Sequence, residues 1–589
     1  MNSGFSSSRW ARDEPSGHPC GRSTSAESAP GDRHPAVNQI YPSTAFYHSG
    51  KGGRVLDVTQ PPFNAKGDGG TDDTQALVSA MRFVRDNYEI LQGPGFSYCA
   101  QKLNHNWIVY LPDGEYLVSD SVSQGWPALA MNLHQGWSHI QYLHVDSPKH
   151  EQELYAKDPA ERPVLHGNPA LPAGDDNAGS HIRGQFNSAE VYAENNWALR
   201  IVGQSRDRTV IRLKDSTEGF GQGAGKAVLA FYLLQRGSNV NIGNAIENVT
   251  IATGKGNPGA VGLKWNSSNW GGVRNVAIRS GDGLGRAGLV TDANNAIGYH
   301  HDLLIDGFGT GIEISAGRET MVALEYATLS GQRDTAIKVG DAKAGGGGDS
   351  LSARKIQVLD APVALRAGRA GQAILLESEL TSNHEQAAAL IVERDGYLMA
   401  RDLRLSGYRV AVVRNGENVL TGKTIQEYAS ANPIGWTEKA PSQSLRLPVK
   451  DSPLILPEQD LSRWASVDDF GAVGDGIVDD SVAIQGAMDS GKPVVYFPKA
   501  NCVVNGTVDI PATVREITWL FGGVHRSNAS ERDGAGLFRV TESSEEPLRM
   551  HQAATAGGVF FDHEADRRSS SMTFMSILTI PGATQVRRI

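Results

Sequence analysis

The chain has 589 residues, of which 67 are glycine and only 7% are aromatic, and this favours several domains built from short strands and turns. Its net charge of −10 and the lack of a basic run argue against nucleic-acid binding, and no apolar run has membrane-spanning length. The three cysteines are too widely spaced to indicate a disulfide framework or a metal site, and no cofactor motif is present.

The first predicted segment, residues 1–45, is polar and rich in Ser, Gly and Pro. It lacks the apolar core of a signal peptide, so we predict a disordered leader and no secretion signal in this chain. A first folded module is expected over residues 46–440. Within it, an insertion over residues 124–196, approximately, interrupts the repeat of strands. This insertion is either a loop that covers a substrate or a loop with a structural role alone.

Two nearly identical phrases mark the start of folded units: GDGGTDDT at 67–74 and GDGIVDDS at 474–481. Each follows a short apolar strand and precedes apolar residues spaced as on one face of a helix. The spacing predicts helices over 74–87 and 481–489, with strand pairs over 109–122 and 495–508 behind them. We interpret the two copies as an internal duplication of a domain start.

An acidic pair ends each phrase, Asp72–Asp73 in the first copy and Asp479–Asp480 in the second. Carboxylates directly before a helix accept hydrogen bonds from its first amides and meet the positive end of its dipole. We therefore predict that these residues cap the two helices and are neither metal ligands nor catalytic acids.

Between the two starts, strand-like segments of alternating apolar residues recur at intervals in the twenties. They are AIENVTI (245–251), VRNVAI (273–278), HDLLID (301–306), LEYATL (324–329), ARKIQVL (353–359), AILLESEL (373–380) and LMARDLRL (398–405). This period is typical of stacked β-helix coils, whereas the strands of a β-sandwich would recur every 8–12 residues or so. We predict a parallel β-helix.

The order of strand, G-D-G-x-x-D-D-[ST], helix and Y-[LF]-P resembles the opening of a pectate-lyase-superfamily domain. Two such openings, with GLKWNSSNWGGVRNVAI at 262–278, resemble glycoside hydrolase family 55, the exo-β-1,3-glucanases. The resemblance implies an all-β fold, a right-handed parallel β-helix in tandem modules with short capping helices. It also implies an extracellular protein acting on polysaccharide by inverting hydrolysis. After a Pro-containing linker over 441–460, the second module, 461–589, is too short to equal the first.

Candidate catalytic residues come from VFFDHEADR at 559–567, where Glu564 and Asp562 would share one face of a strand. An inverting glycosidase needs two such carboxyl groups, and clustering raises the pKa of the one that donates the proton. The alternative interpretation, which is favoured for such an acidic stretch, is an ordinary solvated end of a strand.

Candidate substrate-binding residues come from two neighbouring coils, where aromatic rings would stack on sugars and amides would bind hydroxyl groups. Packing of the two tryptophans inside the protein is an equally good interpretation. The predicted set is Trp265, Asn266, Asn269, Trp270, Asn294, Tyr299 and His300.

The sequence leaves two other functions open, a polysaccharide lyase of the pectate-lyase type and a non-catalytic polysaccharide-binding or structural β-helix protein such as a tailspike-like module. A lyase would need a calcium site or another charge neutraliser beside an Arg, Lys or Tyr base. The sequence does not identify the sugar, the linkage or the oligomeric state.

Overall fold

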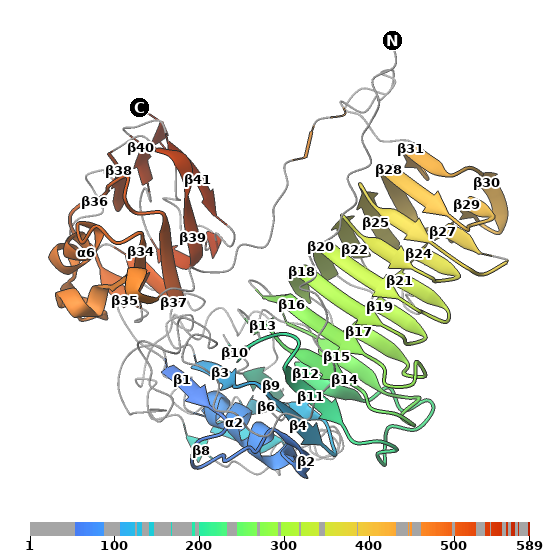
Figure 1. Ribbon diagram of the computed structural model, residues 1–589, viewed down its shortest axis with the longest axis horizontal. Coiled ribbons are helices and arrows are strands. Elements are labelled where there is room, and N and C mark those ends of the chain that lie inside the picture. Colours follow the sequence, from blue (N-terminus) through green and yellow to red (C-terminus); the bar gives the residue numbers. More distant parts are fainter. Residues whose placement is uncertain are drawn as a thin grey trace.

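The structure is a computed structural model, and in the residues that it describes nearly all regular structure is β-strand (Figure 1). The described residues are 54–86, 107–123, 126–131, 141–145, 166–167, 191–194, 199–231, 244–267, 271–292, 296–316, 320–340, 348–385, 387–431, 446, 448–449, 461–497, 501–525, 536–541, 544–556, 561–563, 567–571, 575–576 and 587–588. The predicted leader, residues 1–45, lies outside them, as does most of the predicted linker.

Two sheets run the length of the large stack of strands in Figure 1. The 17-stranded sheet contains β1 (Arg54–Asp57), β2 (Asp68–Asp72), β3 (Trp107–Leu111), β4 (Gly114–Val118), β10 (Leu199–Gly203), β11 (Thr209–Leu213), β13 (Ala245–Glu247), β14 (Thr250–Ala252), β16 (Gly272–Arg279), β18 (Ile297–Asp306), β20 (Thr320–Ser330), β22 (Asp349–Arg354), β23 (Gln357–Leu359), β25 (Gly371–Leu376), β26 (Glu379–Thr381), β28 (Tyr397–Ser406) and β31 (Thr424–Ala429). The 10-stranded sheet contains β5 (Val122–Ser123), β12 (Ala227–Phe231), β15 (Val261–Trp265), β17 (Ala287–Thr291), β19 (Thr310–Ile314), β21 (Thr335–Val339), β24 (Val363–Ala367), β27 (Ala388–Val392), β29 (Val410–Arg414) and β30 (Glu417–Leu420).

Along this stack each strand pairs in parallel with the equivalent strand of the next coil, as β16 does with β18 and β18 with β20. Antiparallel pairing closes the far end, where β31 lies on β28 and β30 on β29. Every predicted strand segment of the repeat lies in the 17-stranded sheet. The pairing is that of a parallel β-helix, and the alternative of an antiparallel sandwich is wrong for this stack.

A column of residues with left-handed backbone conformation bends each coil within the 17-stranded sheet. Their φ angles lie between 47° and 60°, and they are Asn248, Asn275, Asp302, Tyr326, Lys355, Glu377 and Asp402. Neighbouring strand pairs place these residues in register from coil to coil. Asn and Asp tolerate this conformation best, and the side chain of Asn275 donates a hydrogen bond to that of Asn248 (2.9 Å).

The interior of the stack is one continuous apolar core filled by alternate side chains of each strand. In β18, for example, Leu303 and Ile305 are buried while Leu304 between them is half-buried on the opposite face. Burial of such columns along the coils is the main favourable contribution to the stability of the stack.

Both predicted helices are present, α2 (Thr74–Asp86) and α6 (Ser481–Met488), but the predicted role of Asp73 and Asp480 is wrong in detail. Both carboxylates are buried and reach back to the glycine turn. Asp73 accepts hydrogen bonds from the amides of Lys66 (2.7 Å) and Gly67 (2.9 Å). The turn leaves these amides without strand partners, so the carboxylates fasten the turn and do not cap the helix.

The predicted insertion of about 124–196 contains a small sheet of its own. Its antiparallel strands are β6 (Trp126–Met131), β7 (Gln141–Val145), β8 (His166–Gly167) and β9 (Val191–Glu194). This antiparallel pairing separates the insertion from the parallel coils on both sides of it.

The C-terminal part has separate sheets and a separate core. An eight-stranded sheet contains β32 (Trp464–Ser466), β33 (Asp475–Asp479), β34 (Val494–Phe497), β35 (Asn501–Val503), β37 (Glu516–His525), β39 (Ser544–Ala556), β41 (Arg567–Ser571) and β42 (Met575–Ser576). A four-stranded sheet contains β36 (Val508–Ile510), β38 (Phe538–Val540), β40 (Phe561–His563) and β43 (Arg587–Arg588). Two short 3-10 helices, η3 (Leu461–Arg463) and η4 (Val467–Phe470), flank β32 at the beginning of the C-terminal part. The strand pairs within these two sheets are parallel. No helix in the described parts of the chain is long and apolar enough to cross a membrane.

Candidate functional site

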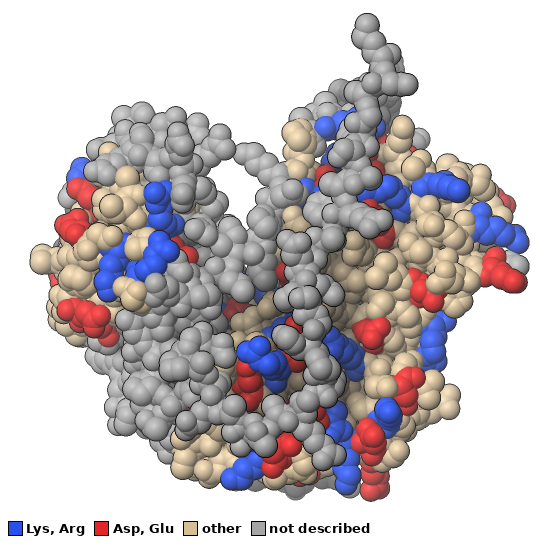
Figure 2. Space-filling view, viewed as in Figure 1, with Lys and Arg blue, Asp and Glu red and all other residues tan. Residues whose placement is uncertain are grey.

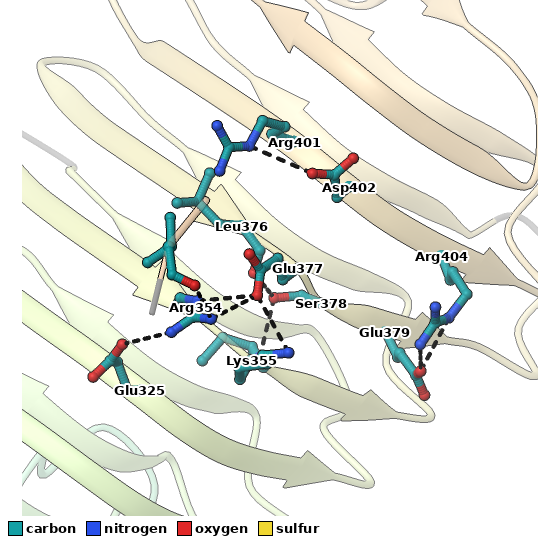
Figure 3. Close-up of polar contacts among 12 residues, drawn as sticks. Glu325, Arg354, Lys355, Leu376, Glu377, Ser378, Glu379, Arg401, Asp402 and Arg404 are labelled. Carbon is teal, nitrogen blue, oxygen red and sulfur yellow. Dashed lines mark hydrogen bonds and ion pairs between the residues drawn. The ribbon is translucent and has the colours of Figure 1, made fainter. Parts of the chain in front are cut away.

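A row of charged side chains crosses successive coils on the outer face of the 17-stranded sheet (Figure 3). Each of these positions directly follows a core residue or occupies the left-handed bend, so the side chains point away from the core. We call this row the polar ladder, and its members are Glu325, Arg354, Lys355, Glu377, Arg401 and Asp402. Glu325, Arg354 and Arg401 occupy equivalent positions of β20, β22 and β28.

Arg354 is the centre of the ladder, and its side chain is only 6% exposed. Its Nε and Nη2 atoms donate to Glu377 Oε2 at 3.0 and 2.8 Å, and its Nη1 lies 3.6 Å from Glu325 Oε1. Lys355 Nζ lies 3.2 Å from the same oxygen of Glu377. The guanidinium therefore lies between two carboxylates that come from neighbouring coils.

The charge of Glu377 is stabilised by these contacts. Burial alone would raise the pKa of this carboxyl, but the hydrogen bonds and charges of Arg354 and Lys355 outweigh burial and lower the pKa below its usual value. Glu377 is therefore ionised at neutral pH. It can accept hydrogen bonds from a ligand but is not suited to donate a proton as a general acid.

Aromatic side chains adjoin the ladder on the coils before Arg354. Tyr299 donates its hydroxyl proton to Glu325 Oε2 at 2.8 Å. The ring of His301 lies between those of Tyr299 and Tyr326, with ring centroids 5.9 and 5.0 Å away. Both tyrosines are half-buried, whereas His301 is buried. These rings place apolar surface beside the hydrogen-bonding groups of a carboxylate and a guanidinium.

Opposite charges alternate further along the same face. Glu247 is buried between Arg200 and Arg274, with Arg274 Nη1 3.2 Å from its Oε1 atom. At the other end, Arg401 Nε lies 3.5 Å from Asp402 Oδ2. The face is therefore a nearly balanced series of cations and anions and not a patch of one sign.

Trp265 was predicted to contact a sugar, and the structure corrects this prediction. The side chain is fully buried in the core, with its ring 5.1 Å from Phe231 and 5.6 Å edge-on from His300. Its Nε1 atom donates to the carbonyl of Ile297 at 3.4 Å. A ring that is enclosed on all sides presents no face to a ligand, so the interpretation as a packed core aromatic is the correct one.

Asn266 and His300 are buried too, and both serve the frame of the coils. Asn266 exchanges two hydrogen bonds with Asp292 on the next coil, of 2.8 and 3.0 Å. His300 Nδ1 accepts from the amide of Val273 at 3.2 Å. Burial, with a smaller contribution from the charge of Arg274, lowers the pKa of His300 to about 3, so this histidine is neutral and structural.

Of the predicted substrate-binding residues in the described part of the chain, Tyr299 lies beside the polar ladder, through its hydrogen bond to Glu325. Three others, Asn269, Trp270 and Asn294, lie outside the described residues, as does the catalytic candidate Glu564. Asp562 belongs to β40, between Arg539 of β38 and Arg587 of β43, and its side chain lies outside the described part. Neighbouring coils do bring Trp265 and His300 together, as predicted, but inside the core.

The ladder itself was missed, although the sequence carries a pattern for it. A charged residue or histidine precedes the bend residue on most coils, as in ENV, RNV, HDL, EYA, RKI and RDL. When the strand segments are aligned on the apolar residue after the bend, these charges fall into one column. We had assumed a strict alternation of inward and outward residues along each segment. The bend residue shifts that alternation by one position, so the column of charges was not recognised.

Comparisons with known proteins agree with this fold. The family model of rhamnogalacturonase A/epimerase, pectate lyase-like, matches residues 61–127 and 464–517, which are the two duplicated openings. A glucan 1,3-beta-glucosidase of Cochliobolus carbonum is 24% identical over 197 residues, which are 29% of this chain and 25% of that protein. The chain thus spans about a quarter of the length of this relative.

Solved structures resemble the chain more distantly. The surface adhesin PfbA of Streptococcus pneumoniae shares 11% identity, covers 63% of this chain and 96% of its own, and has a TM-score of 0.29. ORF18 of Geobacillus virus E2 shares 12% identity over 61% of this chain and 59% of its own, with a TM-score of 0.30. Over its two openings the chain is thus similar to pectate-lyase-like proteins, and the similarity to the glucosidase agrees with the resemblance to glycoside hydrolase family 55.

Proposed function

We propose that the protein is a carbohydrate-active protein that binds a neutral polysaccharide along the polar ladder and hydrolyses it, with a β-1,3-glucan as substrate. The observation that carries the proposal is the ladder itself: carboxylates and guanidiniums on successive coils, beside half-buried tyrosine rings. The proposal includes the right-handed coil and the tandem modules that the family resemblance implies.

The repeat of the ladder suits a linear sugar polymer. Strands of neighbouring coils lie about 4.8 Å apart, which is comparable with the size of one pyranose ring. A polymer that follows the helix axis would therefore present one sugar to each coil. Hydroxyl groups both donate and accept, so each can bind a carboxylate of Glu325 or Glu377 and a guanidinium such as Arg354. Charge-assisted hydrogen bonds of this kind are about twice as strong as neutral ones.

The balance of charge favours a neutral polymer over a polyuronate. Glu325, Glu377 and Asp402 would repel a carboxylated sugar on the coils where Arg354, Lys355 and Arg401 attract it. Figure 2 shows the same mixture on a larger scale, because acidic and basic side chains are interspersed over the described surface of the view. The choice of a β-1,3 linkage is supported by the similarity to the glucan 1,3-beta-glucosidase.

For hydrolysis we propose Glu564 as general acid and Asp562 as its partner carboxylate. One carboxyl group protonates the leaving oxygen, and the other, as carboxylate, activates a water molecule on the opposite face of the sugar. Support comes from their spacing in VFFDHEADR, since residues two apart on a strand point to the same face. Trp270, Asn269 and Asn294 stay candidate substrate contacts, together with Tyr299.

Calorimetric titration with laminarin oligosaccharides tests the binding proposal. Glu325→Gln keeps the size of the side chain but removes its charge, and it should weaken binding roughly tenfold, the equivalent of one charge-assisted hydrogen bond. Glu379→Gln is the matched control, because Glu379 pairs with Arg404 on an exposed part of β26. Equal affinities of the two variants for the oligosaccharide would show that the polar ladder is not the binding site.

Product analysis tests the chemistry. Release of glucose or short oligosaccharides from laminarin, lost in Glu564→Gln, is the expected result. An unsaturated, ultraviolet-absorbing product from polygalacturonate would show a lyase instead. Binding of laminarin without turnover would show a non-catalytic binding protein, and binding of neither polymer would refute the proposal altogether.

A further inference from the structure

Part of the connector between the two openings lies on the polar ladder. Arg354 Nη2 donates a hydrogen bond to the carbonyl oxygen of Val449 at 3.2 Å. Arg446 Nη2 donates to Asp402 Oδ1 at 3.0 Å. The described connector residues Arg446, Pro448 and Val449 therefore cross the outer face of the coils that carry β22 and β28. We call these three residues the strap.

The strap uses the groups that a sugar would need. The carbonyl of Val449 occupies a guanidinium N–H of Arg354, which would otherwise donate to a hydroxyl group of a ligand. Arg446 occupies a carboxylate oxygen of Asp402 that could accept from one.

The strap is held weakly. Arg446, Pro448 and Val449 are all exposed, and Val449 retains 40% of its surface. The pair of Arg446 with Asp402 is exposed to solvent as well, with side chains 52% and 44% accessible. Surface ion pairs of this kind contribute little to stability, because solvent screens both charges. The contact can therefore be replaced by a ligand of moderate affinity.

We propose that the strap is an autoinhibitory contact: it occupies the ladder at Arg354 and Asp402 when no ligand is bound, and a polysaccharide displaces it. This inference rests on the proposed function, since it concerns the same face. A site that is competent for only part of the time has an apparent affinity reduced by that fraction. Release of the strap should therefore tighten binding by about two- to fivefold, the range that one surface ion pair allows.

Arg446→Gln is the variant that tests this competition, with Arg404→Gln as the matched control. Arg404 belongs to another exposed ion pair, with Glu379, that does not involve the strap. Titration with laminarihexaose should give two- to fivefold tighter binding for Arg446→Gln and unchanged binding for Arg404→Gln.

A second measurement reports on the strap without relying on affinity. Trypsin cleaves after Arg446 only when that side chain is free to enter the protease. The wild-type protein should be cleaved there several times faster in saturating laminarihexaose, and Asp402→Asn should be cleaved at the fast rate without ligand. Identical cleavage of Asp402→Asn and the wild type would overturn the strap.

The possible failures are distinguishable. If the wild type binds the oligosaccharide but Arg446→Gln binds it no more tightly, the competition is wrong and the proposed function stands. If neither the wild type nor any variant binds it, the proposed function and the competition both fall. In that case faster cleavage of Asp402→Asn would still show where the connector lies.

Discussion

The two openings of the chain share their buried carboxylate and glycine turn but differ at their exposed positions. In the first, Asp73 holds the amides of Lys66 and Gly67; in the second, Asp480 holds those of Val473 (2.7 Å) and Gly474 (3.2 Å) and lies 3.3 Å from the amide of Val503. The buried carboxylate and its turn have thus been retained in both copies. The two copies share a structural motif that begins a stack of coils. This structural role is sufficient to explain their similarity, without a shared active site.

The exposed positions of the two openings diverge. The first copy has polar residues or glycine where the second has exposed apolar side chains, namely Lys66, Gly70, Thr71 and Gln75 against Val473, Ile477, Val478 and Val482. One buried position also differs, because Tyr116 in β4 corresponds to Cys502 in β35. The comparison teaches that the fold constrains the carboxylate closely but tolerates change around it.

The largest expected effect is loss of the shared carboxylate. Asp73→Ala and Asp480→Ala should each lower the free energy of unfolding by about 3–5 kcal/mol, since the amides of the turn lose a buried charged acceptor. Scanning calorimetry measures this. Asp68→Ala, at an exposed aspartate that accepts hydrogen bonds from the amides of Gly70 and Thr71, is the control and should have a much smaller effect. Melting that depends on calcium in the wild type alone would show instead that the aspartates are metal ligands.

A smaller effect follows from exchanging the buried residue that differs. Tyr116→Cys gives the first opening the residue of the second and should cost about 2–4 kcal/mol, because the ring supports Gly67 and would leave a cavity. Tyr116→Phe keeps the ring and loses the hydrogen bond to the carbonyl of Pro112, which should cost about 1 kcal/mol. If both variants melt alike, the ring does not support the turn.

Tyr116 should also give the first opening a sensitivity to alkali above pH 10. Burial, and then the nearby charges of Asp57 and Asp73, raise the pKa of Tyr116 well above 10. Above pH 10 the unfolded chain loses this proton while the folded one keeps it, so stability should fall with rising pH. The slope is at most about 1.4 kcal/mol per pH unit. Urea titrations from pH 9 to 11 should show a flatter dependence for Tyr116→Phe.

The smallest effect is expected on the surface. Val482 is 86% exposed on α6, so Val482→Gln, which restores the residue type of the first opening, should change stability by less than about 0.5 kcal/mol. Heat denaturation at matched concentration measures it. A loss of several kcal/mol would mean that this side chain is covered in solution.

The frame of the protein was predictable from its sequence because apolar periodicity and duplicated motifs act locally. The segments at 273–278 and 301–306 are strands of one sheet, and helices begin at Thr74 and Ser481 where the motif placed them. The strands of the 10-stranded sheet were not predicted. Segments such as AVLAF in β12 are buried throughout, so they lack the alternation on which the prediction depended.

The candidate site was less predictable, since the same residue types serve the core and the surface. Trp265 and His300 both seemed suited to bind a sugar, and both are buried. For His300 the reason is the bend residue that each coil carries in the 17-stranded sheet, because it decides which side of a strand faces outward. That bend turns His300 inward and His301 to the ladder. Arg354 and Glu377 are 23 residues apart, and they pair because one coil has nearly that length. The sequence predicted only that strands recur every twenty to thirty residues or so, which is too imprecise to predict a particular pair.

The column of left-handed residues has a consequence for how such a protein can change over time. Coils differ in length, with hydrogen-bonded neighbours 22 residues apart at one point and 29 at another, yet the bends stay aligned. Gains and losses of residues must therefore be absorbed in the connections between the sheets. Insertions and deletions in those connections can therefore change the binding surface during evolution while the stacked coils stay the same.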